Sequence, residues 1–147
     1  MHKKTKGSIA ELRVSADLMQ KGWRVLIPYG ENNRYDLVAE REGKFLRIQV
    51  KYVTPRNGAL YVGCFSSNNW SVQHYTAQQI DAIAVYDAVS EKVYYVPADK
   101  MRKSAMLLRL LPAKNGQKTK IRYAKNFDGS GLVCEGAGAR VAKGAGL

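Results

Sequence analysis

The segment YDLVAEREGKFLRIQVK, residues 35–51, carries the clearest structural signal in the chain. Two runs with the composition of β-strands flank the Glu-Gly pair at residues 42–43, so the segment predicts a β-hairpin with a tight turn. Because successive side chains of a strand point to opposite faces, Gln49 and Lys51 are expected on one face, about 6.6 Å apart. The opposite face of the same strand carries apolar side chains: Leu46, Ile48 and Val50.

Asp36 lies on the first strand of this hairpin, so it can join Gln49 and Lys51 across the turn. An acid, an amide and a fixed ammonium together are a credible site for a hard cation. The pattern therefore predicts the active-site hairpin of a nuclease.

The size of the chain favours a single domain. It has 147 residues, of which 46% are hydrophobic, enough to bury one core. We expect this domain to span residues 1–135. Residues 136–147, GAGARVAKGAGL, have little to bury and are expected to form a flexible tail.

The charge predicts a polyanionic partner. Lysine and arginine total 24 against 12 acidic residues, giving a net charge of +12. No apolar run approaches the roughly 18 residues of a transmembrane helix, so double-stranded DNA is favoured and binding to a membrane surface is a minor alternative. The basic start, MHKKTKGS, leads into an amphipathic helix rather than the apolar core of a secretory signal, so a cytoplasmic protein with access to DNA is expected.

The cysteines and histidines do not predict a metal site. Cys64 and Cys134 are far apart and lack the spacing of a structural zinc site, so inert or buried thiols are expected. His74 has no partner acids in register and is expected to be structural or exposed.

The first helix is predicted over residues 8–21. Ser8 and Glu11 have the spacing of a capping box, and Gly22 follows where a C-terminal glycine belongs. Glu11 has two interpretations: it only caps the helix, or it places a carboxylate at the margin of the core. The expected buried stripe is Ile9, Leu12, Ala16 and Met19.

Further elements follow from turn signals and apolar runs. Thr76 opens a second possible capping box, TAQQ, which predicts a short helix, and Asp99 is expected to cap a brief helical turn after Pro97. Polar loops are expected at residues 29–34 and 66–70, of which the first delivers the chain to Asp36. The expected strands and apolar runs are residues 23–28, 60–65 (the fourth strand of the sheet), 80–86 and 92–96.

A basic region follows, because no acidic residue lies between Lys100 and Phe127. An Asn-Gly pair at residues 115–116 separates two strand-like runs and predicts a basic β-hairpin, which fits a DNA groove. The alternative is a solvated edge that charge protects from aggregation. The candidate DNA-binding residues are Arg34, Arg56, Arg109, Lys114, Lys118, Lys120, Arg122 and Lys125.

Together, Glu11 on a helix, Asp36, and Gln49-x-Lys51 after a short hairpin resemble the PD-(D/E)xK nuclease superfamily. The segments YDLVA and FLRIQVK are more narrowly similar to its homing endonucleases encoded in cyanobacterial group I introns. The resemblance covers residues 7–100. It implies a restriction-endonuclease-like α/β (α+β) fold, with a mixed central β-sheet flanked by helices, to which this chain adds the basic hairpin.

The resemblance also implies roles for the four residues. Glu11, Asp36 and Gln49 would hold magnesium, or manganese as a substitute, and Lys51 would assist the attacking water. Tyr35 stands where many relatives have proline, and Gln49 replaces the usual acid. An amide oxygen coordinates magnesium without adding negative charge, so Glu11 becomes more important.

The sequence therefore predicts a magnesium-dependent, site-specific endonuclease that hydrolyses phosphodiester bonds of duplex DNA. Because a small chain must cut both strands, a homo-oligomer is expected, either a dimer or a tetramer. A Holliday-junction resolvase or a restriction-type nuclease would use the same residues. A third alternative is a non-catalytic, basic nucleic-acid-binding module on the same fold, in which Asp36 and Lys51 form a plain ion pair.

Overall fold

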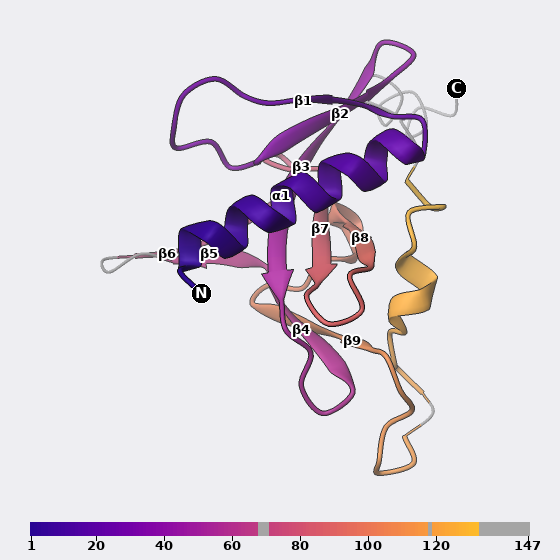
Figure 1. Cartoon of the computed structure of the whole chain (residues 1–147). Coiled ribbons are helices and arrows are strands. Elements are labelled where there is room, and N and C mark those ends of the chain that lie inside the picture. The colour runs from indigo at the N-terminus through magenta and orange to yellow at the C-terminus, as the bar shows by residue number, and fades with distance from the viewer. Residues whose placement is uncertain (68–70, 118, 133–147) are drawn as a thin grey trace.

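A mixed five-stranded sheet in the order β1-β2-β3-β7-β8 forms the centre of the fold, shown in Figure 1. We describe it from a computed structural model, which covers residues 1–67, 71–117 and 119–132. Strands β3 and β7 are parallel, whereas the other neighbouring strands of this sheet are antiparallel. The predicted mixed sheet is thereby confirmed. Its strands are β1 (Arg24–Leu26), β2 (Leu37–Arg41), β3 (Lys44–Val53), β7 (Ala82–Asp87) and β8 (Val93–Pro97).

The central hairpin forms as predicted, from β2 and β3. Arg41 pairs with Lys44, and the two residues between them have positive φ, 53° at Glu42 and 77° at Gly43. Two consecutive positive φ angles match the right-handed twist of the flanking strands, which is why a glycine suits the second position. The predicted alternation along β3 is also confirmed, because three alternate side chains are buried: Leu46, Ile48 and Val50.

Helix α1 (Lys3–Gln20) begins five residues earlier than predicted. The side chain of His2 caps it by accepting a hydrogen bond from the backbone N–H of Lys4, at 3.2 Å. The predicted cap at Ser8 is therefore wrong, since the lysines that precede it are good helix formers and extend the helix. The end is as predicted: Gly22 has a φ of 89° and follows the last turn.

The buried face of α1 also differs from the prediction. Leu12 and Met19 are 72% and 64% exposed and Ala16 is exposed as well, so the predicted stripe is wrong at these three positions, while Ile9 is half-buried. The residues of α1 that are fully buried are Ala10, Val14 and Leu18. Their spacing of four makes one stripe of the helix, and contact with the sheet selects this stripe over its neighbour.

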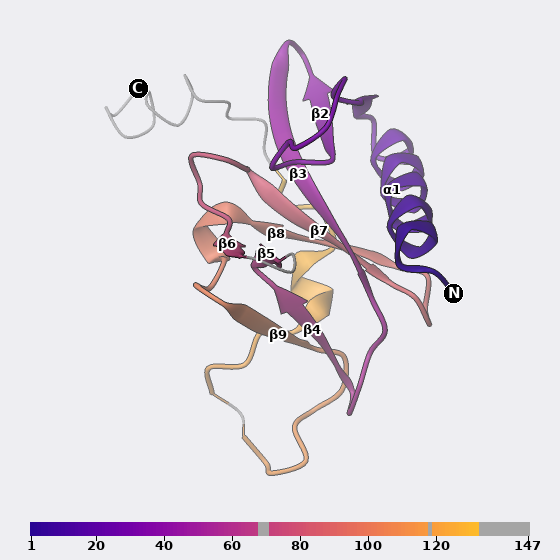
Figure 2. The same ribbon diagram turned by 90° about the vertical axis from the view of Figure 1, so that its left-hand side faces the viewer.

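Two core clusters lie on the two faces of the sheet. The side chains of β7 enter them alternately, Ala84 on the side of α1 and Ile83 and Val85 on the other side. A strand buried on both faces reads as a continuous apolar run, and all six residues of β7 are buried. Figure 2 shows α1 on one side of the sheet and the strands β4 and β9 on the other.

The second face is covered by a separate two-stranded sheet of β4 (Ala59–Gly63) and β9 (Ala105–Arg109), together with the short helix η2 (Ala124–Phe127). The strand predicted at residues 60–65 is thus not a fourth strand of the central sheet. Within the described ranges α1 is the one α-helix, so a helix flanks the sheet on one face. The predicted fold class is confirmed, with this qualification of its second layer. No helix of the described ranges is long and apolar enough to cross a bilayer.

Two short connections differ from their predictions. The strands β5 (Phe65–Ser67) and β6 (Val72–His74) pair with each other where a loop was predicted at residues 66–70, of which residues 68–70 lie outside the described part. At Thr76 the backbone N–H donates to Oε1 of Gln79, as in a capping box, but only one turn follows because β7 begins at Ala82.

The short helix η1 (Ala98–Lys100) forms where a brief helical turn was predicted. Its N-cap residue is Pro97, and no side chain caps it. The capping role predicted for Asp99 is therefore wrong, since Asp99 lies inside the first turn.

The predicted basic hairpin does not form between its two strand-like runs. The turn is present, with Gly116 at a φ of 74° donating to the carbonyl of Ala113. However, β9 pairs with β4, and Arg109 meets the returning chain through a single bridge to Tyr123. Since β4 buries apolar side chains of β9, this distant partner outcompetes the local one. Lys118, Cys134 and the predicted tail at residues 136–147 lie outside the described residues.

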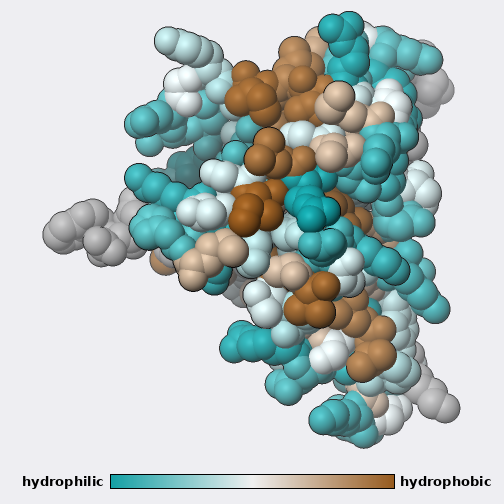
Figure 3. All heavy atoms as spheres, viewed as in Figure 1, coloured by the Kyte–Doolittle hydropathy of each residue, from teal (hydrophilic) through white to brown (hydrophobic). Residues whose placement is uncertain are grey.

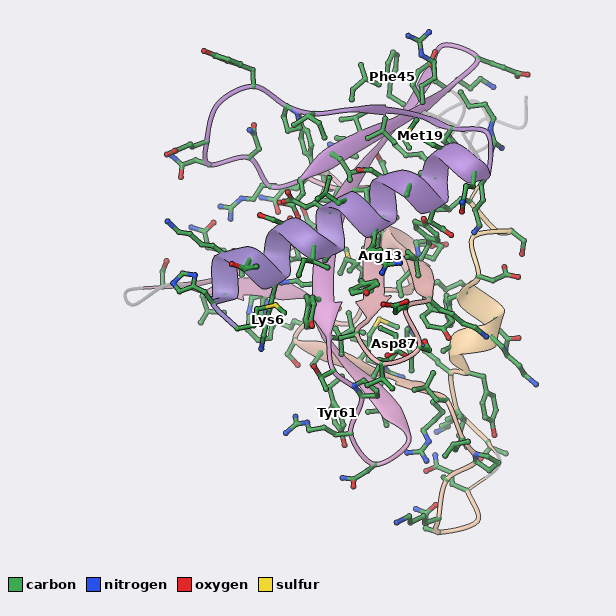
Figure 4. All side chains as sticks on the ribbon, viewed as in Figure 1. Lys6, Arg13, Met19, Phe45, Tyr61 and Asp87 are labelled. Carbon is green, nitrogen blue, oxygen red and sulfur yellow. The ribbon has the colours of Figure 1, made fainter. Side chains whose placement is uncertain are left out.

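An apolar surface remains exposed on the outer side of α1. Figure 3 shows apolar side chains gathered over α1 and the neighbouring part of the central sheet, and Figure 4 shows Met19 and Phe45 near one end of this area. The large apolar residues exposed on α1, β1 and β3, with the residue that follows β1, are Leu12, Met19, Leu26, Ile27 and Phe45. We call this set the α1 apolar surface.

Candidate active site

Asp36 is fixed against β3 by two hydrogen bonds. Its backbone N–H donates to the carbonyl of Ile48 at 2.8 Å, and its Oδ2 accepts from the backbone N–H of Val50 at 2.8 Å. These bonds hold the carboxylate beside the strand that carries Gln49 and Lys51. Burial raises the pKa of Asp36, while the hydrogen bond from Val50 and the charge of Lys51 oppose that rise.

Glu11 contributes a second carboxylate from α1. The buried stripe of Ala10 and Val14 presses the helix against the core that includes β3, which brings Glu11 toward Asp36. Burial raises the pKa of Glu11, and the negative charge of Asp36 raises it further. The two carboxylates therefore repel each other at this place, and a cation between them would relieve the repulsion.

Lys51 is held by groups that follow it in the chain. Its Nζ donates to the backbone carbonyl of Phe65 at 2.9 Å and lies 5.1 Å from the ring centroid of Tyr75. Burial lowers the pKa of Lys51, and the charge of Asp36 opposes this. Among the ion pairs of the described residues there is no direct pair between Asp36 and Lys51. The plain ion pair of the non-catalytic alternative is therefore not the contact that Lys51 makes.

Gln49 is half-buried on β3 and its amide nitrogen is 3.4 Å from the carbonyl oxygen of Val50, its hydrogen-bond acceptor. Its Oε1 accepts no hydrogen bond from any residue in the described ranges. The amide oxygen is thus available as a ligand, whereas the amide nitrogen has a partner.

The oxygen donors of this cluster fit magnesium or manganese. Within the described ranges no group of three histidine, cysteine, aspartate or glutamate residues could hold a metal ion. The predicted set instead has two carboxylates and one amide oxygen, from Glu11, Asp36 and Gln49. Hard cations prefer such oxygen ligands and commonly complete their shell with water. The donor chemistry therefore suits the predicted metal with a smaller negative charge than three acids would supply.

Arg47 lies on the same face of β3 as Gln49 and Lys51 but has a structural task. Its guanidinium pairs with the buried carboxylate of Asp81 at 3.0 Å, and it also donates to the carbonyl oxygens of Ala77 and Gln78. With its donors used in this way, Arg47 ties β3 to the turn that precedes β7.

Several groups near the site were missed from the sequence. Lys3 belongs to the first turn of α1, and its charge lowers the pKa of Lys51. Lys6 lies 5.7 Å from the ring centroid of Tyr52, at the N-terminal end of α1 in Figure 4. The run of lysines at the start of the chain was the available signal. No sequence signal pointed to Tyr75, because its contact with Lys51 depends on the path of β5 and β6.

The predicted DNA-binding residues that the structure describes fall in four places. Arg34, half-buried, precedes Asp36 closely, and its charge acts on the pKa of Tyr75. Arg56 is exposed and lies 5.1 Å from the ring centroid of Tyr61. Lys125 lines a hollow of about 880 Å³ beside η2. A second hollow of about 670 Å³ is lined by a cationic group that we call the basic pocket: Arg102, Arg109, Lys114, Lys120 and Arg122.

Two arginines of the basic pocket are engaged with the backbone. Arg109 donates to the carbonyl oxygens of Asn57, Leu111 and Pro112, and Arg122 donates to that of Lys100. These bonds hold the loop that follows β9. The exposed lysines of the pocket, Lys114 and Lys120, have freer ammonium groups at its rim.

Two solved structures resemble this chain. The chain superposes on the structure of a bacterial homing endonuclease, I-Ssp6803I, with a TM-score of 0.70 and 24% identity, over 100% of this chain and 98% of that one. It also matches a Holliday junction resolvase, Hjc of Archaeoglobus fulgidus, with a TM-score of 0.44 and 14% identity, over 71% of this chain and 84% of that one. The first match shows the same fold. A comparison with curated protein sequences gave no match.

The sequence also matches a protein-family model over nearly its whole described length. The match spans residues 1–130, and the family is described as PD-(D/E)XK endonuclease. The matched span includes all four residues of the candidate site. This chain therefore belongs to the PD-(D/E)XK endonuclease family.

Proposed function

We propose that this protein is a site-specific endonuclease of the homing type, which hydrolyses phosphodiester bonds of duplex DNA with magnesium. The observation that carries the proposal is the meeting of Glu11, Asp36, Gln49 and Lys51, drawn from α1, the segment before β2, and β3. Family membership supports nuclease chemistry. The homing type is supported by the similarity of the segments YDLVA and FLRIQVK to such enzymes.

The four residues have two tasks in the proposed reaction. Glu11, Asp36 and the Gln49 amide oxygen would hold the metal ion. Magnesium bound there supplies positive charge that polarises the phosphate and makes a water molecule more acidic. Lys51, held by the Phe65 carbonyl, places its ammonium beside Asp36, where it orients the attacking water or stabilises the negative charge that develops on the phosphate.

The cleavage products test this proposal directly. We expect the protein to cut a library of long duplex targets into discrete products when magnesium is present, with manganese as a substitute and with no cutting in a chelator. A preference for four-way junctions would instead identify a resolvase, and cutting at short recognition sites would identify a restriction-type enzyme. DNA binding without cutting under all of these conditions would favour the non-catalytic module.

Substitutions of Gln49 test whether this residue is a metal ligand or only a polar residue of the strand. Gln49→Glu should keep metal-dependent cleavage, with half-maximal activity at the same or lower magnesium, because it adds a carboxylate at the same place. Gln49→Leu, similar in size but without an oxygen, should reduce the cleavage rate about 100-fold or more. The measurement is the cleavage rate against magnesium concentration.

The matched control for Gln49→Leu is Gln20→Leu, at an exposed position at the end of α1. Thermal melts of both variants check that they fold. A fully active Gln49→Leu would remove this residue from the metal site and leave Glu11, Asp36, the backbone and water as the ligands.

Contact with DNA is proposed to involve the rim of the basic pocket. The net charge of +12 supports a polyanionic partner, and Lys114 and Lys120 are exposed at this rim. Replacing both lysines with glutamine should weaken binding and reduce the slope of log Kobs against log salt concentration by about 1.8, at about 0.9 for each phosphate that is no longer neutralised. Fluorescence anisotropy with a labelled duplex measures the slope.

The control for the rim lysines removes the same charge elsewhere. Lys44→Gln with Lys92→Gln neutralises two exposed lysines in β3 and before β8. An equal fall of the slope in both double variants would show that only total charge matters, and no fall in the rim variant would place the pocket away from DNA.

We propose a homo-oligomer, a dimer or a tetramer, because each chain supplies one candidate active site and a duplex has two strands. The α1 apolar surface is the candidate interface with a second copy, since single exposed apolar residues are ordinary but a group of them is typical of a contact surface. Sedimentation equilibrium measures the mass, and a monomer at working concentrations would contradict this proposal.

A further inference from the structure

The hairpin of β5 and β6 closes over the side chain of Lys51. Phe65, at the start of β5, provides the carbonyl oxygen that accepts from Nζ at 2.9 Å. Tyr75, directly after β6, presents its ring at 5.1 Å from the same ammonium. One contact thus comes from the first strand of this hairpin and the other from the residue that follows its second strand, and the pairing of the strands places Phe65 opposite His74.

Tyr75 is itself firmly placed. It is 8% exposed, and its backbone N–H donates to the carbonyl of Cys64 at 3.0 Å. Burial raises the pKa of the Tyr75 hydroxyl, and the side chain of Ser66 opposes this rise. The start of the hairpin thus contributes to the position of the ring in addition to the contact with Lys51.

The turn that follows Tyr75 is tied to the same strand as Lys51. Arg47 of β3 donates to the carbonyl oxygens of Ala77 and Gln78 and pairs with Asp81. Arg47 and Lys51 lie on one face of β3, so this strand contacts the segment around Tyr75 at two points. These contacts keep the ring at a constant place relative to the site.

An ammonium on a four-carbon stem needs this kind of restraint. Holding a lysine side chain in one conformation costs rotamer entropy. An aromatic face within about 6 Å attracts the cation, and the attraction is larger where water is excluded. The carbonyl of Phe65 uses one of the three N–H donors, which leaves others for a water molecule or a phosphate oxygen.

We infer that Tyr75 is a positioning residue for Lys51, which acts through its aromatic ring. The ring and the Phe65 carbonyl together hold the ammonium beside Asp36. The contact with Lys51 is made by the aromatic ring and does not need the hydroxyl, so phenylalanine should replace tyrosine without loss. The kinetic consequence rests on the proposed cleavage activity, whereas the contact itself does not.

The test compares Tyr75→Phe with Tyr75→Leu in the full chain. In NMR spectra without metal or DNA, the ε protons of Lys51, assigned by their absence in Lys51→Met, should be shifted upfield by the ring in the wild type and in Tyr75→Phe. Tyr75→Leu should abolish that shift. In single-turnover cleavage with magnesium, Tyr75→Leu should be slowed about 10- to 100-fold, while Kd for DNA changes less than about threefold and Tyr75→Phe stays near the wild-type rate.

Tyr94→Leu is the matched control. Tyr94 is also 8% exposed and belongs to the same core cluster, but its ring makes no described contact with Lys51. It should lose a similar amount of thermal stability and keep both the Lys51 shift and the cleavage rate. If Tyr75→Leu does not fold, Tyr75→Met, which fills irregular space without a ring, carries the same comparison.

Three results overturn the inference: an unshifted Lys51 in the wild type, an unchanged rate in Tyr75→Leu, or an equal loss of rate in Tyr94→Leu. A different result marks failure of the proposed function alone. In that case the Lys51 shift follows the aromatic ring as expected, but the wild type cuts no DNA.

Discussion

Replacing Asp36 with asparagine should reduce the rate of DNA cleavage about 1,000-fold or more. Asparagine has nearly the same shape, and its amide oxygen can still accept the hydrogen bond from the N–H of Val50, so the fold should persist. It removes the charge that would hold the metal ion, and metal ions contribute several kcal/mol to transition-state stabilisation. Each 1.36 kcal/mol is a factor of ten in rate.

The measurement is single-turnover cleavage at saturating DNA, with Kd for the same duplex determined separately. Kd should stay within about tenfold of the wild type, since one charge changes in a chain of net charge +12. Asp99→Asn is the control, because Asp99 is an exposed acid in η1 and its loss changes the net charge equally. Full activity of Asp36→Asn would remove this residue from the site.

Replacing Lys51 with methionine should lower the cleavage rate about 100- to 1,000-fold. Methionine keeps most of the apolar stem that is buried near Tyr75, but it has no ammonium to place beside Asp36. The loss is of the size seen when one preorganised donor to a developing negative charge is removed. Thermal stability should change little, since the described contacts of the ammonium are one hydrogen bond and one aromatic ring.

Lys44→Met is the control for Lys51→Met, because it removes a lysine from the exposed start of the same strand. The cleavage rate, Kd for DNA and melting temperature are measured for both. If Lys51→Met weakens DNA binding as much as it slows cleavage, the ammonium binds a phosphate in the ground state. If Lys51→Met unfolds the protein, the contacts of the Lys51 ammonium with Phe65 and Tyr75 serve mainly to stabilise the fold.

The central hairpin was predictable because its signals are local. A glycine in a two-residue turn and the alternation of side chains along β3 depend on neighbouring residues only. The same alternation placed Gln49 and Lys51 on one face and the apolar residues on the other, as the burial confirms. The cap of α1 was misjudged because two local signals competed, Ser8 and the helix-forming lysines before it.

The predictions that were wrong concern contacts between segments far apart in the chain. The apolar residues of α1 permit two adjacent stripes, and only contact with the sheet selects Ala10 and Val14 over Leu12. The strand-like run that includes most of β9 was predicted as one strand of a local hairpin, but β9 pairs with β4. The second run of the predicted hairpin cannot bury as much apolar surface of β9 as β4 does. The choice of a pairing partner by a strand depends mainly on such burial.

The amino-acid sequence alone was enough to predict the fold class, the central hairpin and the four candidate residues, Glu11, Asp36, Gln49 and Lys51. These depend on residue type, spacing and strand alternation, all of which are properties of short segments. The tertiary structure decided which groups surround them. Phe65 and Tyr75 reach Lys51 because the chain from β5 through β6 returns to the side chain of Lys51. Arg47, on the same face of β3, is engaged by Asp81 instead of the site. Contacts of this kind join segments far apart in the chain, and their energy depends on burial that no single segment contains.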